Sequence, residues 1–466
     1  MPGLFQGLEI GRRALLTSQF TLQTIGHNIA NVNTPGFSRQ RVNISTTMPE
    51  NNTIGTFGSG VQVTDIQHIR DLFLGDQYRQ ESKSLGEWSY KEKVLSQIET
   101  VFNEPNDNNL SDQMNKFWNA WDDFAKNPDP ATSTSTRNQL VSQTIQMTNA
   151  FHQLSDQIDK LRTSIDADLE NYTNEINRMT SEVAMLNHQI QSIEVGGIRA
   201  NDLRDSRDLI LDSLSSMVDI NTHENSKGEM VVYIGSMSVV NGEDAINIQG
   251  KVANIDGKAT HRLVWEGTDI ELTNTNGELK ALIDSRDNII PKYIDKLDTL
   301  AATLVESVNA IHSTGSTKNG QTNIQFFNPN KTKASNIKIN ADILANQLLI
   351  TSSVSGEASD NTLANEIAGL RSKNVLNNGS TSLSDYYNSI IGTVGVDSNE
   401  ASSFATNYDL LVQQIEFAKE SVQGVSLDEE MTNMIKYQHA YDAAARVITS
   451  MDQALDTVLN MGVVGR

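Results

Sequence analysis

One stretch of the sequence restricts the possible folds more than any other. Residues 131–195 contain neither glycine nor proline, and their apolar residues recur at alternating steps of three and four. This spacing places one apolar face along an α-helix. A helix through most of the stretch would be roughly 90 Å long, which favours an extended bundle over a compact globular core. Two successive steps of four, from Leu161 to Ile165 to Leu169, form a stutter that locally unwinds a coiled-coil seam.

Further helical patterns flank this stretch. Gly196-Gly197 ends it, and the pattern resumes over residues 202–217. A second long pattern covers residues 279–312, where Pro291 should either kink the helix or restart it as a first-turn proline. Shorter amphipathic segments are predicted at residues 88–102, 110–125, 386–394 and 404–423, with Trp88, Trp118 and Trp121 as core side chains.

The pattern changes between residues 220 and 276. Short β-branched or aromatic runs at 230–234, 238–240 and 261–265 predict strands, and Asn241-Gly242, Asp256-Gly257 and Asn276-Gly277 predict turns. We interpret this segment as a small β insertion in a helical host. Residues 313–356 are mixed, with strand-like alternation at 337–340.

The two ends of the chain share a heptad pattern. Apolar residues seven apart occur near the start and again near the end, which predicts a helix at each terminus. Small residues in the seams, Gly11, Ser18 and Ala444, would permit close approach of two helices. The first helix should stop near Val32, because the sequence that follows it contains Pro35-Gly36. The predicted assembly interface consists of Leu8, Leu15, Leu22, Ile25, Ile29, Leu427, Met434, Tyr441, Ile448 and Leu455.

Terminal helices of this kind have two interpretations. Most amphipathic helices simply pack on one core. A coaxial pair that also packs against neighbouring copies is favoured here, because a long rod and paired terminal heptads occur in one chain. Ser426-Leu427-Asp428-Glu429 forms a capping box at the start of the last helix, and its acidic residues complement the positive end of the helix dipole.

The same ends carry a family resemblance. The run Ile25-Gly-His-Asn-Ile-Ala-Asn-Val-Asn-Thr-Pro-Gly-Phe37 resembles the N-terminal signature of bacterial flagellar axial proteins, and the next three residues are similar to the hook-associated members. Ala200-Asn-Asp-Leu-Arg-Asp-Ser-Arg207 and residues 427–441 also resemble that family. The family motif residues are Asn28, Asn31, Thr34, Pro35, Gly36, Phe37, Ser38, Arg39 and Gln40.

This resemblance implies a structural role outside the cell. A member would join the flagellar hook to the filament, forming a ring of copies through its terminal helices. Its partners would be the flagellar hook protein, the next hook-associated junction protein and a flagellar export chaperone. It would leave the cell unfolded through the type III export channel without a cleaved signal, and the absence of cysteine suits that passage.

Composition excludes several other classes. Without cysteine there are no disulfides, thiolate metal sites or cysteine nucleophiles. Acidic residues outnumber basic ones 58 to 36, and a net charge of −22 argues against binding nucleic acid. No apolar run approaches the roughly 20 residues of a membrane span, so membrane insertion is not expected. The first ten residues lack the basic and apolar regions of a cleaved signal peptide.

No constellation of catalytic or metal-binding residues stands out. The eight histidines are scattered without an HExxH motif, and there is neither a P-loop nor a GxSxG elbow. Gly55, Gly58 and Gly60 are predicted to form a flexible turn before residues 61–63. Residues 106–109 lack the spacing and final glutamate of a calcium loop and are predicted to form a turn. We therefore expect no catalytic residue, metal or cofactor.

The predicted fold is mainly α with a small β insertion, and it has three parts. Residues 1–42 and 425–466 form a terminal coiled-coil assembly domain, and residues 43–220 and 276–424 form a discontinuous helical bundle. Residues 221–275 form an outer β-rich domain. Two alternative functions stay open: another flagellar axial component, such as hook or distal rod protein, and an acidic secreted hydrolase.

Overall fold

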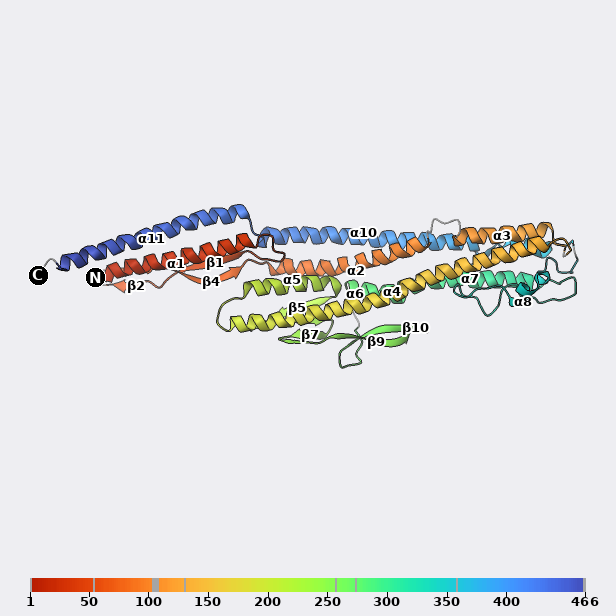
Figure 1. Cartoon of the computed structure of the whole chain (residues 1–466), viewed down its shortest axis with the longest axis horizontal. Helices are drawn as coiled ribbons and strands as arrows, with labels where there is room; N and C mark the ends of the chain where they lie inside the picture. The colour runs from red at the N-terminus through yellow and green to blue at the C-terminus, as the bar shows by residue number, and fades with distance from the viewer. Residues whose placement is uncertain are drawn as a thin grey trace.

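The protein is an elongated helical rod with both termini at one end (Figure 1). The computed structural model describes residues 2–52, 55–102, 109–129, 131–255, 258–272, 275–357 and 359–463. The predicted turns at Asp256-Gly257 and at residues 106–109 lie wholly or mostly outside these described residues. The fold is mainly α with a small β insertion, as the sequence predicts.

The long central helix is α4, Thr134–Glu194. Its 61 residues correspond to roughly 90 Å. Ile165 and Leu169, the two residues after the stutter, are both buried, so the apolar face follows the irregular step. α4 packs against α3 (Leu110–Lys126) and α5 (Asn201–Met217). The buried Trp118 and Trp121 of α3 belong to the same core.

Two more helices run along the rod beside α4. α2 (Leu72–Phe102) pairs with α10 (Leu383–Gln423), and Trp88 of α2 stacks on Phe404 of α10 at a ring distance of 4.4 Å. The sequence predicts two short helices at 386–394 and 404–423, and this is wrong because α10 is continuous through Gly392 and Gly395. Burial of Val394, Ala401 and Ala405 compensates for the poor helix propensity of these glycines. Likewise α2 begins well before the predicted residue 88.

The second predicted long helix is continuous along the chain, but its hydrogen-bonding pattern changes partway. α6 (Glu278–Asp284) passes through a π-helical turn (Ser285–Ile289) into α7 (Ile290–His312). Pro291 therefore lies in the first turn of α7, directly after the π-helical turn, which is the restart that the sequence allows. The short helices α8 (Ala341–Ala345) and α9 (Thr362–Gly369), a 3₁₀ turn (Gln347–Leu349) and the hairpin of β11 (Asn374–Leu376) with β12 (Thr381–Ser382) lie after α7 in the chain.

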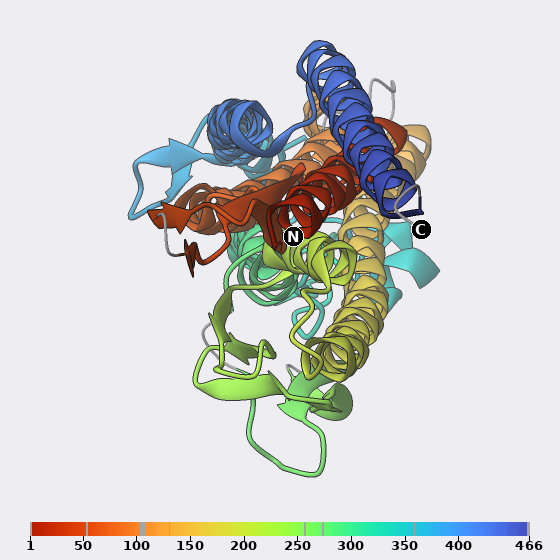
Figure 2. The same cartoon turned by 90° about the vertical axis from the view of Figure 1, so that its left-hand side faces the viewer.

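The β insertion lies alongside α4 (Figures 1 and 2). An antiparallel sheet contains β5 (Ile220–Glu224), β6 (Met230–Ile234), β7 (Met237–Asn241) and β8 (Asp244–Ala245), followed by the hairpin of β9 (Ile248–Ile255) and β10 (Lys258–Trp265). Val232, Val240 and Trp265 belong to the core cluster of the bundle. The division into three domains stays a prediction. Of the predicted strand at 337–340, Ile339 makes an isolated bridge to Phe327.

The terminal elements extend beyond one end of the bundle. α1 (Pro2–Ala30) and α11 (Leu427–Val463) lie side by side, and a β ribbon packs on α1. This ribbon pairs β1 (Gln40–Thr46) with β4 (Val61–His68) and β2 (Glu50–Asn52) with β3 (Gly55–Phe57). Strand β3 therefore occupies part of the flexible turn expected around Gly55. At the start of α11, Ser426 Oγ accepts a hydrogen bond from Glu429 N at 3.5 Å.

Candidate assembly interface and its junction with the bundle

The two terminal helices approach closely at glycines. A methyl group at Gly7 would lie 2.8 Å from Met451 Cε, and one at Gly11 would lie 2.8 Å from Ile448 Cγ1. The earlier glycine, Gly7, faces the later residue of α11, Met451, and Gly11 faces Ile448, so α1 and α11 run antiparallel. A methyl group at Gly11 would also lie 3.7 Å from the carbonyl oxygen of Ala444. Small side chains therefore allow two helices to share a narrow seam.

This pairing leaves much apolar surface uncovered. Among the predicted interface residues Ile25 is buried, at 4% exposed, and Leu427 is exposed at 47%. The other members are half-buried: Leu8, Leu15, Leu22, Ile29, Met434, Tyr441, Ile448 and Leu455. A further set on the same two helices is exposed, namely Phe5, Leu16, Phe20, Met431, Ile435, Val447 and Leu459.

The family motif forms the turn that ends α1. Asn28 is buried, and its side chain makes two hydrogen bonds with the backbone of Gln40, at 2.9 and 3.0 Å. Asn31 Nδ2 donates to His27 O, and Thr34 Oγ1 donates to Asn31 Oδ1. These bonds end α1 at Ala30 and return the chain as β1.

The tip of this turn contacts the bundle. Gly36 has a φ of +76°, and a side chain there would meet Leu209 of α5 at 3.1 Å. Phe37 packs edge-on against His27, with ring centroids 5.4 Å apart. Pro35 follows Thr34 in the exposed part of the turn. The motif thus combines a helix end, a left-handed glycine and a close contact with α5.

Helix α5 presents a row of aspartates to the terminal elements. Asp202 accepts from Gln40 Nε2 at 2.6 Å and lies 3.2 Å from His27 Nε2. Asp205, which is buried, accepts from Ser38 N at 2.9 Å and pairs with His68 Nδ1 at 3.1 Å. We name Asp202, Asp205, Asp208 and Asp212 the aspartate row. Its first half, Asp202 and Asp205, connects α1, β1 and β4 to the bundle.

The second half of the row connects α5 to α2, to the residues just before α2 and to α10. Asp208 pairs with Arg70 and with Arg79, and Asp212 pairs with Arg79 Nε and Lys419 Nζ, each at 2.7 Å. These side chains are about one-tenth exposed, so removing one partner of a pair would leave a poorly solvated charge without its counter-ion. Lys419 also lies over the ring of Tyr78, and burial raises the pKa of the Tyr78 hydroxyl above its ordinary value.

Arg39 joins the motif turn to the last helix. Its Nη1 donates to Glu429 at 2.6 Å, and its Nε pairs at 2.9 Å with Glu430, which is buried. The backbone N–H of Arg39 donates to Gln423 O at the end of α10. One residue of the motif thus contacts both helices that meet at Gly424.

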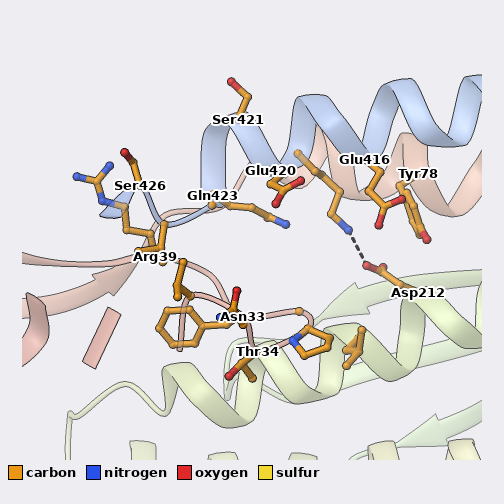
Figure 3. A pocket seen from close by; sticks show the side chains of 18 of the residues that line it. Asn33, Thr34, Arg39, Tyr78, Asp212, Glu416, Glu420, Ser421, Gln423 and Ser426 are labelled. Atoms are coloured by element: carbon orange, nitrogen blue, oxygen red, sulfur yellow. Dashed lines mark hydrogen bonds and ion pairs between the residues drawn. The ribbon is translucent and has the colours of Figure 1, made fainter. Parts of the chain in front are cut away.

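A cleft opens between the motif turn and the end of α10 (Figure 3). Its volume is about 1230 Å³. Asn33 and Thr34 line one side, and Tyr78, Glu416 and Glu420 line the other, where a dashed line marks the ion pair of Lys419 with Asp212. Among the described residues no group of three or more histidine, aspartate or glutamate side chains could hold a metal ion. Within the described ranges, every helix falls short of the length and apolarity that a membrane span requires.

The sequence did not single out the aspartate row as a site. It identified residues 200–207 by resemblance alone, without assigning a partner to any of them. A signal is present, because spacings of three, three and four place all four aspartates within about one-third of the helix circumference. Their partners lie at distant positions in the sequence, and only the tertiary structure reveals them.

Comparison with known proteins identifies the family. Residues 95–327 match the helical domain of flagellar hook-associated protein FlgK, and residues 421–461 match the C-terminal region of flagellar basal body rod proteins FlgEFG. Flagellar hook-associated protein 1 of Bacillus subtilis (strain 168) is 34% identical, with both chains fully covered. The same protein of Escherichia coli (strain K12) is 23% identical over 96% of this chain and 98% of its own.

A solved structure is similar in fold. The flagellar hook junction protein FlgK of Burkholderia pseudomallei superimposes with a TM-score of 0.64 at 14% identity, covering 76% of this chain and all of the other. The full-length match at 34% identity and the helical-domain model agree with this fold. The chain belongs to the flagellar hook-associated protein 1 (FlgK) family.

Proposed function

We propose that this chain assembles at the end of the flagellar hook through its paired terminal helices, α1 and α11. As a member of the family it is a structural component of the hook–filament junction in the bacterial flagellum. Copies of the chain form a ring in which the terminal pair of each copy packs against neighbouring subunits. The observation that supports this proposal is the apolar surface that α1 and α11 leave exposed after they have paired.

The physical reason is the free energy of that surface. A two-helix pair buries only one side of each helix, and contiguous exposed apolar surface on a soluble protein marks an interaction site. Each additional large apolar side chain that becomes buried contributes about 1.5–3 kcal/mol. Neighbouring copies and the flagellar hook protein are the partners that cover it, and the next hook-associated junction protein binds the opposite end of the ring.

Export from the cell precedes this assembly. The chain passes through the type III channel unfolded, and a flagellar export chaperone covers its terminal apolar residues before secretion. Two properties support this part of the proposal: no cysteine is present to form a disulfide, and both terminal helices expose large apolar residues.

Charged substitutions in the terminal seam test the proposed function. Leu22→Asp and Ile448→Asp should each abolish binding of the full-length chain to purified hook ends, because a carboxylate cannot be buried there without a partner. Circular dichroism and urea denaturation should show that the central bundle stays folded. Val252→Asp, on the exposed face of β9, is the matched control and should bind like the wild type. Undiminished binding of both seam variants would contradict the proposal.

A further inference from the structure

A second apolar surface lies where α10 meets α11. Phe417 is 75% exposed near the end of α10, and Leu427 begins α11. Glu416, Glu420 and Asp428 are exposed around them. The neighbouring cleft of Figure 3 is lined by four acidic and two basic side chains. We name this surface the acidic edge; its large apolar members are Phe417 and Val422 on α10, together with Leu427, Met431 and Ile435, which it shares with the exposed face of α11.

A surface of the opposite charge surrounds the turn between α4 and α5. Val195 is 85% exposed and Leu72 is 76% exposed, and both line a cleft of about 730 Å³. Four basic and two acidic side chains line that cleft, the reverse of the ratio at the acidic edge. The exposed cations here are Arg199 and Lys227. We name this surface the basic tip; its apolar members are Leu72, Ile193, Val195 and Ile198.

The two surfaces lie on opposite sides of the molecule. In both views the end of α10 and the end of α4 are on opposite sides of the rod (Figures 1 and 2). Helix α5 separates them, since its Leu209 and Asp212 line the acidic cleft and its Arg204 lines the basic one. Two complementary surfaces on opposite sides cannot pair within one chain. They can pair between successive copies, and such a heterologous contact repeats around a ring.

We infer that the acidic edge of one copy docks on the basic tip of the next copy. This inference rests on the proposed function and adds a lateral contact near the bundle to the contact between terminal helices. With a net charge of −22 per chain, copies repel one another unless opposite charges meet locally. The basic tip supplies those charges, and the apolar side chains around it supply the buried centre. Complementary charge also sets the orientation of the contact, because two copies that met through their acidic edges would bring carboxylates together.

Chemical cross-linking tests the geometry. Because the chain has no cysteine, Val195→Cys and Phe417→Cys each introduce a single thiol into the full-length protein. A mixture of the two variants, treated with a short bismaleimide, should give mixed dimers well in excess of like dimers. A chain carrying both cysteines should give a ladder of oligomers in solution and on hook ends. In the control, Val252→Cys takes the place of Val195→Cys in the mixture with Phe417→Cys. If this control gave as many mixed dimers as the test mixture, the inference would be overturned.

Charge reversal tests the attraction. Arg199→Glu should lower the yield of mixed dimers about tenfold, and Glu420→Arg on the other partner should restore it. Lys160→Glu, on the exposed middle of α4, makes the same change of charge and should have no effect. An unchanged yield in Arg199→Glu, or no rescue by Glu420→Arg, would reject the docking.

The two proposals fail in different ways. If the wild type does not bind hook ends, the proposed function is wrong, whatever the cross-links show. If the wild type binds hook ends but mixed dimers and ladders are absent in solution and on those ends, the proposed function stands and the lateral contact is wrong.

Discussion

His312 illustrates how a single buried side chain makes the bundle sensitive to pH. It is fully buried, its Nδ1 donates to Ile324 O at 2.7 Å, and its Nε2 accepts from Thr351 N at 3.1 Å. These bonds require the neutral imidazole. Burial lowers the pKa of His312 from 6.5 to about 4, with the nearby Arg137 adding to the effect. His312 is therefore a core residue that proton uptake destabilises.

The sign of this effect predicts a loss of stability in acid. Between about pH 6.5 and 4 the unfolded chain binds a proton that the folded chain does not, so the contribution of His312 is complete above 6.5 and is lost as the pH falls. His312→Gln keeps one donor and one acceptor without a titration. From about pH 7 to pH 4 the wild type should lose about 3 kcal/mol more than this variant in urea denaturation. Equal losses would show that His312 does not carry the effect.

Two glycines of α1 provide a matched comparison at the terminal seam. A methyl group at Gly11 would lie 2.8 Å from Ile448, whereas one at Gly26 would meet nothing within 4 Å. Gly26→Ala should stabilise the helix by up to about 1 kcal/mol, since alanine is the better helix former. Gly11→Ala should instead cost about 1–3 kcal/mol, because the added methyl group would force the helices apart. Thermal unfolding of both variants measures the difference, and similar values would argue against close packing in the seam.

At the scale of elements, α5 is the helix that holds the terminal elements on the bundle. Its aspartates differ in burial, so their contributions should differ as well. Asp205 is buried and accepts from Ser38 N and His68, while the side chain of Asp202 is 62% exposed. A buried donor that loses its acceptor is far more costly than an exposed one, which can bind water instead.

This difference predicts unequal effects of two similar substitutions. Asp205→Ala should lower the free energy of unfolding by about 1–3 kcal/mol, because Ser38 N loses its acceptor. Asp202→Ala should cost less than about 1 kcal/mol. Urea denaturation of the two full-length variants gives the comparison. If Asp202→Ala proved as harmful as Asp205→Ala, burial would not be the cause.

At the scale of the whole molecule, the terminal pair is stabilised less than the bundle. Of the described side chains on α11, Glu430 and Ala444 are buried, whereas α7 buries a continuous face from Ile290 to His312. Regions with few buried apolar contacts open at low free energy. The heptads at the two ends are therefore suited to become fully ordered when neighbouring copies cover them.

Limited proteolysis tests this difference in stability. In the free chain, cleavage should occur first in roughly the first 30 and last 40 residues, before the bundle. The same segments should become resistant when the chain is bound to hook ends. Mass spectrometry of the fragments over time provides the measurement. Terminal segments that resist cleavage as well as α4 does in the free chain would refute the prediction.

The sequence alone determined the features that depend on local pattern. The period of apolar residues specified α4 and its stutter, the heptads specified the terminal helices, and turn residues specified the β insertion, because each is a property of neighbours along the chain. Local pattern failed at α10, where packing on α2 outweighs two glycines. Only the tertiary structure decided which charges meet: Arg39 and Glu429 are 390 residues apart. It also placed the acidic edge and the basic tip on opposite sides of the molecule. Each surface combines segments that are distant in sequence, so no local pattern predicts how the two surfaces lie relative to each other.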